Sequence, residues 1–334
     1  MNDRRRAAIF TLGLLLMASS LSAAVIKIGS VAPGRSIWDK ALNDLALEWE
    51  KITGGAVQIK IYPGGVVGGE PDMLTKMRLG TLGGAVFTNM GMSDIYPDTT
   101  VLITPFLMNS DQEFNYVFAR LKPELEKPIE ARGFKVIFWT LIGWDYFFSK
   151  GPVIYPEDLK KEKLSYTTSE PEMGHAWKKM GYQLVPNDLR DLLMALQSGI
   201  NTAFYLPPLV AASGQFFALA PHMLNLPLGP VIGSLVVTDK VWNSIPEQYR
   251  EPMLKAIDRI SVRLYQQTLD LDKEALKTMA DNGLIIHQPP ADALERWRAV
   301  AALGMDEIVG KAFSKDIYDR FLALLQEYRQ KVGK

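Results

Sequence analysis

The sequence contains no cysteine, which excludes several kinds of chemistry. Without a thiol there is no disulfide bond, no cysteine nucleophile and no site for lipid attachment at an N-terminal cysteine. Histidine is scarce as well: His175, His222 and His287 lie far apart, and none has a second histidine three or four residues away. We therefore expect no metal site, and a fold held by its buried core alone.

Beyond residue 24 the sequence also lacks an apolar run of the ~18 residues that a membrane span needs. The first 24 residues differ, because Arg4 to Arg6 precede an apolar stretch and small residues follow it, as in a cleavable secretory signal peptide. Cleavage near Ala23 or Ala24 predicts a periplasmic protein; the alternative is an uncleaved N-terminal anchor. Of the 37 basic and 37 acidic residues, three arginines and one aspartate lie in this segment, which leaves 34 against 36. So balanced a charge predicts no nucleic-acid partner.

Catalytic motifs are missing too. There is no Gly-x-Ser-x-Gly sequence, and residues 304–312 (GMDEIVGKA) have the wrong spacing for a phosphate-binding loop, with Ala312 where a hydroxyl is needed. The glycine-rich residues 63–70 end in Glu70, which would repel an anion, so these glycines are expected to shape the backbone. No pair of carboxylates stands at a spacing that nominates a general acid and base. We expect a protein that is not an enzyme and carries no cofactor.

Short apolar strands alternate with amphipathic helices in the first part of the mature chain. The expected order is strand 25–31, helix 36–54, strand 56–62, a glycine loop and helix over 63–80, and strand 83–89. This succession predicts an α/β fold, in which helices cover the faces of a sheet.

Later stretches bear on domain organisation. Residues 134–150 form a long aromatic and β-branched run, which predicts one strand leaving a first domain and another starting a second. Residues 246–283 predict one long helix, or two helices that meet near Asp270. Residues 201–210, NTAFYLPPLV, follow a helix and are expected to form a surface connection, although they are unusually apolar.

Five stretches carry a resemblance to a known family: residues 61–88, 104–114, 151–166, 194–208 and 235–257. The first, IYPGGVVGGEPDMLTKMRLGTLGGAVFT, is similar to the strand, proline–glycine loop and helix of the DctP-type solute-binding proteins that serve TRAP (tripartite ATP-independent periplasmic) transporters. The other four stretches follow in the order that this family shows. The resemblance covers nearly the whole mature chain.

The resemblance implies a two-lobed periplasmic-binding-protein-like fold, in which each lobe is a mixed β-sheet flanked by helices. Crossing strands and a long helix would connect the lobes. We expect one lobe at residues 25–142 with about 231–270, and the other at residues 143–230 with about 271–334. It also implies that a small molecule binds in the cleft, that the lobes close on it by hinge motion, and that a membrane permease is the partner.

Three departures from the family concern the ligand. The family usually has an arginine that clamps a substrate carboxylate where this chain has Ser165, and serine offers one neutral hydrogen bond in place of two charge-assisted ones. An Asp-Gly-x-Glu-Asn sequence is replaced by residues 201–205, which end in two aromatic residues. A polar or arginine position near the crossover is occupied by GWDYFF, which brings Asp145. The chain thus resembles the subgroup without the clamping arginine, whose periplasmic partner is a tetratricopeptide-repeat protein.

These departures predict an apolar or weakly polar ligand, lipid-like or aromatic. The expected ligand-binding residues are Trp38, Phe87, Asn89, Met90, Trp144, Tyr146, Ser165, Tyr166, Leu189, Phe204, Tyr205 and Leu209. Three alternatives remain open at this point. The ligand is a small carboxylate held by Lys163 or another cation, the protein is a sensor or scaffold without a transport role, or it is an enzyme of unknown type.

Overall fold

The computed structural model describes residues 24–167, 171–187 and 189–333. Its strands form one sheet in the order β2-β1-β3-β9-β4-β7-β5-β6, with β8 and β10 off this path. The strands are β1 (Ala24–Ser30), β2 (Val57–Tyr62), β3 (Gly84–Phe87), β4 (Phe134–Ser149), β5 (Lys163–Tyr166), β6 (Gln183–Pro186), β7 (Ala203–Leu206), β8 (His222–Leu224), β9 (Gly229–Thr238) and β10 (Ile285–His287). The predicted signal peptide lies, apart from Ala24, outside the described residues, and its cleavage stays a prediction.

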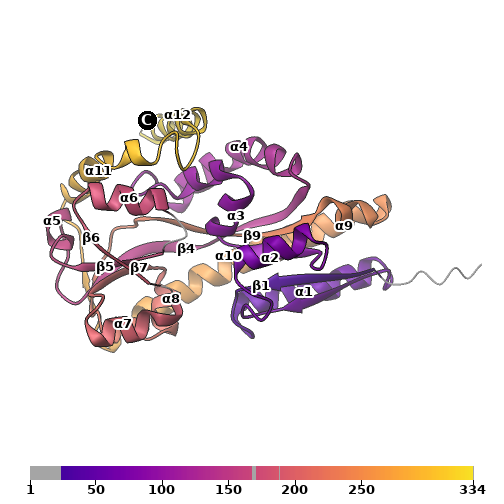
Figure 1. Cartoon of the computed structure of the whole chain (residues 1–334), viewed down its shortest axis with the longest axis horizontal. Helices are drawn as coiled ribbons and strands as arrows, with labels where there is room; N and C mark the ends of the chain where they lie inside the picture. The colour runs from indigo at the N-terminus through magenta and orange to yellow at the C-terminus, as the bar shows by residue number, and fades with distance from the viewer. Residues whose placement is uncertain (1–23, 168–170, 188, 334) are drawn as a thin grey trace, which may run out of the picture.

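Helices pack on both faces of this sheet (Figure 1). The α-helices are α1 (Ile37–Ile52), α2 (Glu70–Arg78), α3 (Asn89–Ile95), α4 (Asp111–Glu130), α5 (Pro156–Leu159), α6 (Pro171–Lys179), α7 (Leu192–Ser198), α8 (Pro208–Ser213), α9 (Asp239–Ser244), α10 (Glu247–Asp281), α11 (Ala293–Ala302) and α12 (Lys315–Val332). The 3-10 helices are η1 (Pro97–Ile103), η2 (Leu189–Asp191), η3 (Phe216–Ala218) and η4 (Met305–Glu307). The predicted α/β fold class is confirmed.

Strand β4 divides the sheet into two halves. Its first part pairs with β9 from Phe134 to Asp145, and its last part pairs with β7 from Tyr146 to Ser149. One half is therefore β2-β1-β3-β9-β4, and the other is β4-β7-β5-β6. The helix α10 contacts α1 in the first half and α8 in the second, so it runs along both (Figure 1). The expected pair of strands at 134–150 is a single long strand, and no break occurs in α10 near Asp270.

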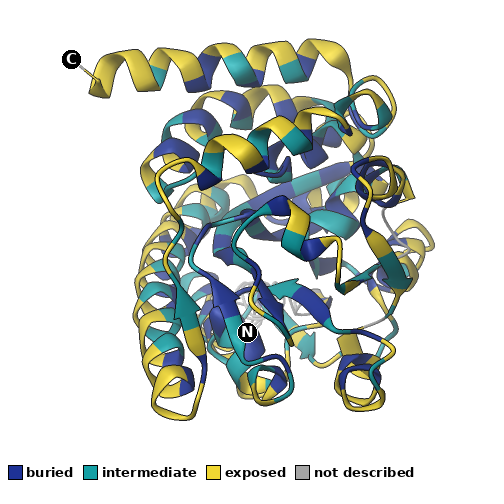
Figure 2. Ribbon diagram, turned by 90° about the vertical axis from the view of Figure 1, so that its left-hand side faces the viewer, coloured by how far each residue is buried: buried dark blue, intermediate teal, exposed yellow. Residues whose placement is uncertain are grey.

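Each half of the sheet is covered on both faces by buried side chains. On the first half, α1, α9 and α10 cover one face, and α2 and α3 cover the other. On the second half, α4, α6, α11 and α12 cover one face, and α7, α8 and the end of α10 cover the other. Figure 2 shows buried residues on the strands and exposed ones on the outer sides of the helices. Helix α4 contributes to the core of the second half, and the lobe limits given above stay a prediction.

The N-terminal caps and the buried faces of the helices follow from their sequences. Ser36 caps α1 by accepting the backbone N–H of Asp39, and Ser110 caps α4 by accepting that of Glu113. The buried residues of α1 are Ala41, Leu42, Leu45 and Trp49, and the spacing of four between Ala41, Leu45 and Trp49 places them on one face of the helix. Amphipathic helices of this kind gain most of their stability from packing on the sheet.

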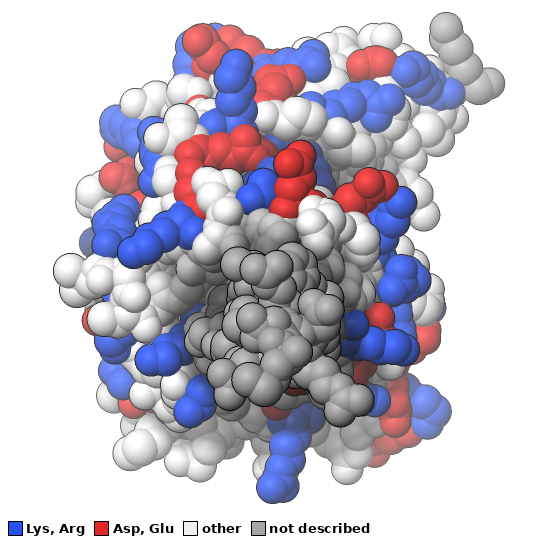
Figure 3. Space-filling model, turned by 90° about the vertical axis from the view of Figure 1, so that its right-hand side faces the viewer, with Lys and Arg blue, Asp and Glu red and all other residues white. Residues whose placement is uncertain are grey.

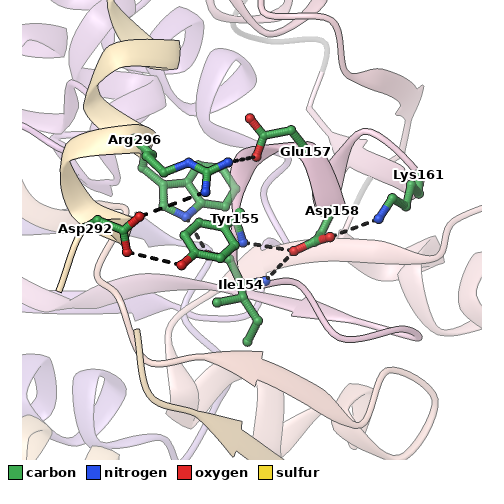
Figure 4. A network of polar contacts seen from close by, with 8 residues as sticks. Ile154, Tyr155, Glu157, Asp158, Lys161, Asp292 and Arg296 are labelled. Carbon is green, nitrogen blue, oxygen red and sulfur yellow. Dashed lines mark hydrogen bonds and ion pairs between the residues drawn. The ribbon is translucent and has the colours of Figure 1, made fainter. Parts of the chain in front are cut away.

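A polar network holds α11 beside the short helix α5 (Figure 4). The Asp158 carboxylate accepts the backbone N–H of Tyr155 at 3.0 Å, which stabilises the start of α5. The Tyr155 hydroxyl donates to Asp292 at 3.1 Å, and the Arg296 guanidinium lies 4.0 Å from the centre of the Tyr155 ring. The PEDL sequence, one of the stretches that resemble the family, therefore has a structural role here.

The residues expected to form an apolar surface connection, 201–210, are mostly regular structure. Residues Ala203–Leu206 are strand β7, in the interior of the sheet between β4 and β5, and Pro208–Ser213 is α8. The expectation of a loop was wrong, because residues 203–206 pair with β4, with Ala203 and Phe204 buried and Tyr205 and Leu206 half-buried. This strand is short, and the two prolines that end it resemble a turn signal in the sequence.

The outer surface carries both signs of charge. On the face shown in Figure 3, Lys and Arg side chains lie among Asp and Glu side chains, and neither sign covers the face alone. Within the described part of the chain, no helix has both the length and the apolar sequence that crossing a membrane requires.

Candidate ligand-binding cavity

A cavity of about 640 Å³ lies between the two halves of the structure. Its wall includes residues 31–36 between β1 and α1, residues 86–90 at the end of β3, and residues 228–231 at the start of β9. From the second half, Tyr205 and Leu206 of β7, Pro207 and the start of α8 contribute, together with Trp177 of α6. Apolar side chains dominate this wall. Ligand pockets of 300–1,000 Å³ with such a lining are typical of small-molecule sites.

The structure brings seven of the twelve expected ligand-binding residues together at this cavity. They are Trp38, Phe87, Asn89, Met90, Leu189, Tyr205 and Leu209. The other five, Trp144, Tyr146, Ser165, Tyr166 and Phe204, are not part of its wall. The cavity thus coincides with part of the expected set, and binding by these seven residues stays a prediction.

Phe204 faces away from the cavity because side chains alternate along a strand. Its ring stacks on that of Phe148 on the neighbouring strand and is 1% exposed, while Tyr205, the next residue, faces the cavity. The core on this face also includes Phe216, whose ring meets Phe204 edge to face. Phe204 is therefore a core residue, whereas Tyr205 lines the cavity.

Two expected residues of β4 lie at the junction of helices instead. The Trp144 indole N–H donates to the Asp111 carboxylate at 2.6 Å, and the Tyr265 hydroxyl donates to the other Asp111 oxygen at 2.8 Å. Burial raises the pKa of Tyr146 to about 12, with a further contribution from the Asp272 and Asp111 carboxylates. Polar partners inside the protein thus engage Trp144, and Tyr146 stands beside two acidic groups.

The strand that carries Ser165 lies outside the cavity wall. Ser165 pairs with Val185 of β6, and the ring of Tyr166 packs against Gly174 of α6. The Lys163 ammonium is exposed and donates to the backbone carbonyl of Gly199 at 3.2 Å. Of the cations considered from the sequence, Lys163 is therefore not placed to reach a ligand in this cavity.

Asn89 is held at the cavity by a buried carboxylate. Glu70 accepts the backbone N–H groups of Thr88 at 3.1 Å and of Gly91 at 2.6 Å, which fixes the start of α3. Burial raises the pKa of Glu70, although these hydrogen bonds oppose the shift. The Asn89 side-chain oxygen accepts the Ile232 N–H at 3.0 Å, so its NH₂ group is the part left to donate to a ligand. Before Glu70, Gly64, Gly65 and Gly68 have positive φ angles of 65°, 70° and 104°, so these glycines shape the backbone as the sequence suggested.

Two residues of the cavity wall, Arg35 and Trp177, are not among those expected from the sequence. Arg35 lies at the exposed loop before α1 with a left-handed backbone (φ 68°), and its position five residues after the end of β1 carries no special signal. Trp177 is 1% exposed and packs near Phe147 and Tyr205. Met173 precedes Trp177 by four residues on the short helix α6. This spacing is the one feature of the sequence that places both residues on the same face of the helix.

Charge is sparse at the cavity. Among the described residues of its wall, Arg35 is the one cation and Asp145 is the one anion. The described residues also hold no group of three or more His, Asp or Glu side chains that are placed to bind a metal ion. The cavity therefore offers a ligand a large apolar surface with few polar groups.

Comparison with known proteins agrees with this architecture. The model of the DctP family, described as bacterial extracellular solute-binding protein family 7, matches residues 28–313. The 2,3-diketo-L-gulonate-binding periplasmic protein YiaO of Escherichia coli is 27% identical over 63% of this chain, and the match spans 65% of that protein, just under two thirds of its length.

Solved structures show the same fold at lower identity. A TRAP periplasmic solute-binding protein of Fusobacterium nucleatum with bound sn-glycerol-3-phosphate superposes with a TM-score of 0.80 at 22% identity, covering 93% of this chain and 100% of that one. One of Xanthobacter autotrophicus with bound β-D-galacturonate gives 0.79 at 18% identity, covering 90% and 99%. The two-lobed fold expected from the resemblance is confirmed. The family match over residues 28–313 confirms that the chain is a solute-binding protein, as expected, and not an enzyme. This chain belongs to family 7 of the bacterial extracellular solute-binding proteins, the DctP family of TRAP periplasmic solute-binding proteins.

Proposed function

We propose that this chain is the solute-binding subunit of a TRAP-type transporter and that it captures an apolar or weakly polar small molecule, lipid-like or aromatic, for delivery to a membrane permease. The observation that supports this proposal most directly is the cavity wall, where one cation and one anion stand among apolar groups within the described residues. We expect the contacts to come from Trp38, Tyr205 and Leu209, with Asn89 as a polar donor.

The size of the cavity supports a ligand larger than a small diacid. At roughly 30 Å³ per water-sized group, 640 Å³ holds about 20 non-hydrogen atoms. At a ceiling of about 0.3 kcal/mol of total binding free energy per atom, such a ligand reaches roughly 6 kcal/mol, which corresponds to a dissociation constant of tens of micromolar. The volume of the cavity is therefore compatible with capture at this affinity.

The competing proposal is a carboxylate or phosphate ligand, as in the relatives named above. Arg35 favours it, since this residue belongs to the cavity wall, and the alternative now depends on Arg35 instead of Lys163. Against it, Arg35 is exposed to water. An exposed guanidinium gains less from an anion than a desolvated one.

Calorimetry with two variants separates these proposals. We expect the neutral probe N-phenyl-1-naphthylamine to bind the wild type and to bind Arg35→Ala and Lys163→Ala with affinities within about threefold. Succinate and glucuronate are expected to bind weakly or not at all. If the ligand is an anion held by Arg35, its removal typically costs 2–5 kcal/mol, or about 30-fold and more, while Lys163→Ala changes little. That result, together with no binding of the neutral probe, would overturn the proposal.

Two finer predictions accompany this proposal. A tetratricopeptide-repeat protein as periplasmic partner follows from Ser165 at the arginine position, and co-purification from periplasmic extract tests it. Export with cleavage near Ala23 or Ala24 predicts a periplasmic form that begins at Ala24 or Val25, and N-terminal sequencing of that form gives the answer.

A further inference from the structure

Helix α8, which forms part of the cavity wall, begins without a cap of its own. Its first flanking residue is Pro207, which has no side-chain acceptor, and Pro208 follows at the first helical position without an N–H group. The N–H of Leu209 is therefore the first backbone donor of this helix. Leu209 and Val210 also line the cavity, so the position of the first turn of α8 determines the position of this part of the cavity wall.

The missing cap is supplied by another helix. One carboxylate oxygen of Asp272, in the second half of α10, accepts the Leu209 N–H at 3.0 Å. This bond spans 63 residues of sequence, and its acceptor carries charge when ionised, which makes such bonds stronger than neutral ones. The cap of α8 is therefore set by tertiary structure.

The same carboxylate meets β4 at an irregular point. The register of β4 against β9 shifts between Leu141 and Gly143, and Gly143 has φ 153°. A Cβ atom at Gly143 would lie 3.0 Å from the second Asp272 oxygen and 3.1 Å from Cβ of Pro207. Three elements thus converge within a side chain's reach: α10, the start of α8, and β4 where it passes from one half of the sheet to the other.

We propose that Asp272 is a positioning residue of the ligand cavity: by capping α8 from α10 beside the β4 irregularity, it ties the Leu209–Val210 wall to the two elements that run between the halves of the protein. Its role for the ligand rests on the function proposed above. The capping itself does not.

The surroundings of Asp272 predict that its action depends on pH. Burial raises its pKa to about 6, the Leu209 hydrogen bond opposes this shift, and the Asp111 carboxylate of α4 adds to it. From β4, Tyr146 is the titratable group beside it. Helix α8 has no titratable side chain, and Asp145 of β4 lines the cavity. On α10 itself, Lys273 and Glu274 are exposed.

Between pH 7 and pH 5 the Asp272 carboxylate becomes protonated and neutral, which weakens its hydrogen bond to the Leu209 N–H of α8.

Hydrogen exchange tests the capping without any ligand. We compare Asp272→Ala, which removes the acceptor, with Asp272→Asn, which keeps an acceptor and removes the charge, and with Glu274→Ala as the control on the same helix. We expect amide exchange over residues 206–214 to rise about tenfold in the Ala variant, by less than threefold in the Asn variant, and not at all in the control. If Asp272→Ala leaves this exchange unchanged, the proposal is wrong.

The affinity for N-phenyl-1-naphthylamine tests the link to the cavity. We expect about a tenfold loss in Asp272→Ala and a loss of less than threefold in Asp272→Asn. We also expect the affinity of the wild type to fall from pH 7 to pH 5, while that of Asp272→Asn stays constant. If the Ala variant does not fold, the last comparison decides, and equal pH profiles of the two proteins overturn the proposal. If the wild type does not bind the probe, the apolar function fails, and the exchange experiment still tests the capping.

Discussion

The ring of Phe204 stacks on the ring of Phe148, its cross-strand partner in β4, with centroids 5.0 Å apart and ring planes 6° apart. Tyr205, the next residue along β7, points to the opposite face and lines the cavity. One peptide unit therefore separates a residue that stabilises the fold from a residue proposed to bind the ligand. Substitutions at these two positions are expected to affect different properties.

For Phe204→Ala we expect a large loss of stability. Removing a fully buried phenyl ring leaves a cavity, and such changes typically lower the free energy of unfolding by about 3–5 kcal/mol. Urea denaturation monitored by circular dichroism gives this value. Phe204→Leu is the milder control, and it is expected to keep probe affinity while it remains folded. A variant as stable as the wild type would show that the Phe148 contact does not hold β7.

For Tyr205→Ala we expect a loss of affinity instead. Removing roughly 60–80 Å² of aromatic contact with the ligand costs about 1.5–2 kcal/mol at ~25 cal/mol per Å². The dissociation constant is then expected to rise about ten- to thirtyfold. Calorimetry with N-phenyl-1-naphthylamine measures it. Tyr205→Phe, which retains the ring, should bind within about threefold of the wild type, and equal losses in both variants would point to the hydroxyl group rather than the ring.

For Gly91→Ala we expect a loss of stability in the first turn of α3, which carries Asn89. A Cβ atom at Gly91 would lie 2.3 Å from a ring carbon of Phe87 and 2.5 Å from a carboxylate oxygen of Glu70. Overpacking of this kind typically costs about 1–3 kcal/mol, which thermal unfolding resolves. Gly34→Ala is the matched control, because its Cβ atom would meet nothing nearer than 3.8 Å. Equal melting temperatures of the two variants would show that the turn yields without cost.

The stability of the protein is expected to depend on pH through Asp272. Its pKa is raised from 3.8 to about 6 on folding, so the folded state binds more protons than the unfolded state between these values. The stabilisation that protonated Asp272 gives to the folded state is fully present below about pH 4 and is lost as the pH rises through about 6. The melting temperature of Asp272→Asn, measured from pH 4 to pH 8, should therefore fall less with rising pH than that of the wild type. Parallel curves would place the pKa of Asp272 near its ordinary value.

The network of Figure 4 predicts a contrast between neighbouring residues of α11. Arg296 forms an exposed ion pair with Glu157 at 2.9 Å, so Arg296→Ala should cost at most about 1 kcal/mol. Trp297 is fully buried and donates to the backbone carbonyl of Ile154 at 3.0 Å, so Trp297→Ala should cost about 3–5 kcal/mol. Denaturation of both variants at low and high salt checks this ranking, and only the Arg296 effect should shrink with salt.

The sequence predicts the fold better than it predicts the site. Periodicity located α1, α2 and the first three strands, because each presents its apolar residues to one or two faces. The interior strand Ala203–Leu206 was missed, since four residues followed by two prolines do not show a period. The continuity of α10 past Asp270 depends on its contacts with both halves, which no local pattern reports.

The site illustrates the same limit. Strand alternation separates Phe204 from Tyr205, but the sequence does not show which of the two faces the cavity. The arginine position of the family pointed to Ser165, whereas the cation at the wall is Arg35, some 130 residues earlier in the chain and brought there by the sheet order. Asp272 had no signal at all, because its partner is a backbone N–H on another helix.

Mass spectrometry of the small molecule released from freshly purified protein tests the central proposal most directly. We expect a neutral or weakly polar compound of about 20 non-hydrogen atoms, as the volume and lining of the cavity require. Recovery of a small dicarboxylate, a sugar acid or a phosphate ester would show that an ionic contact, not apolar surface, selects the ligand.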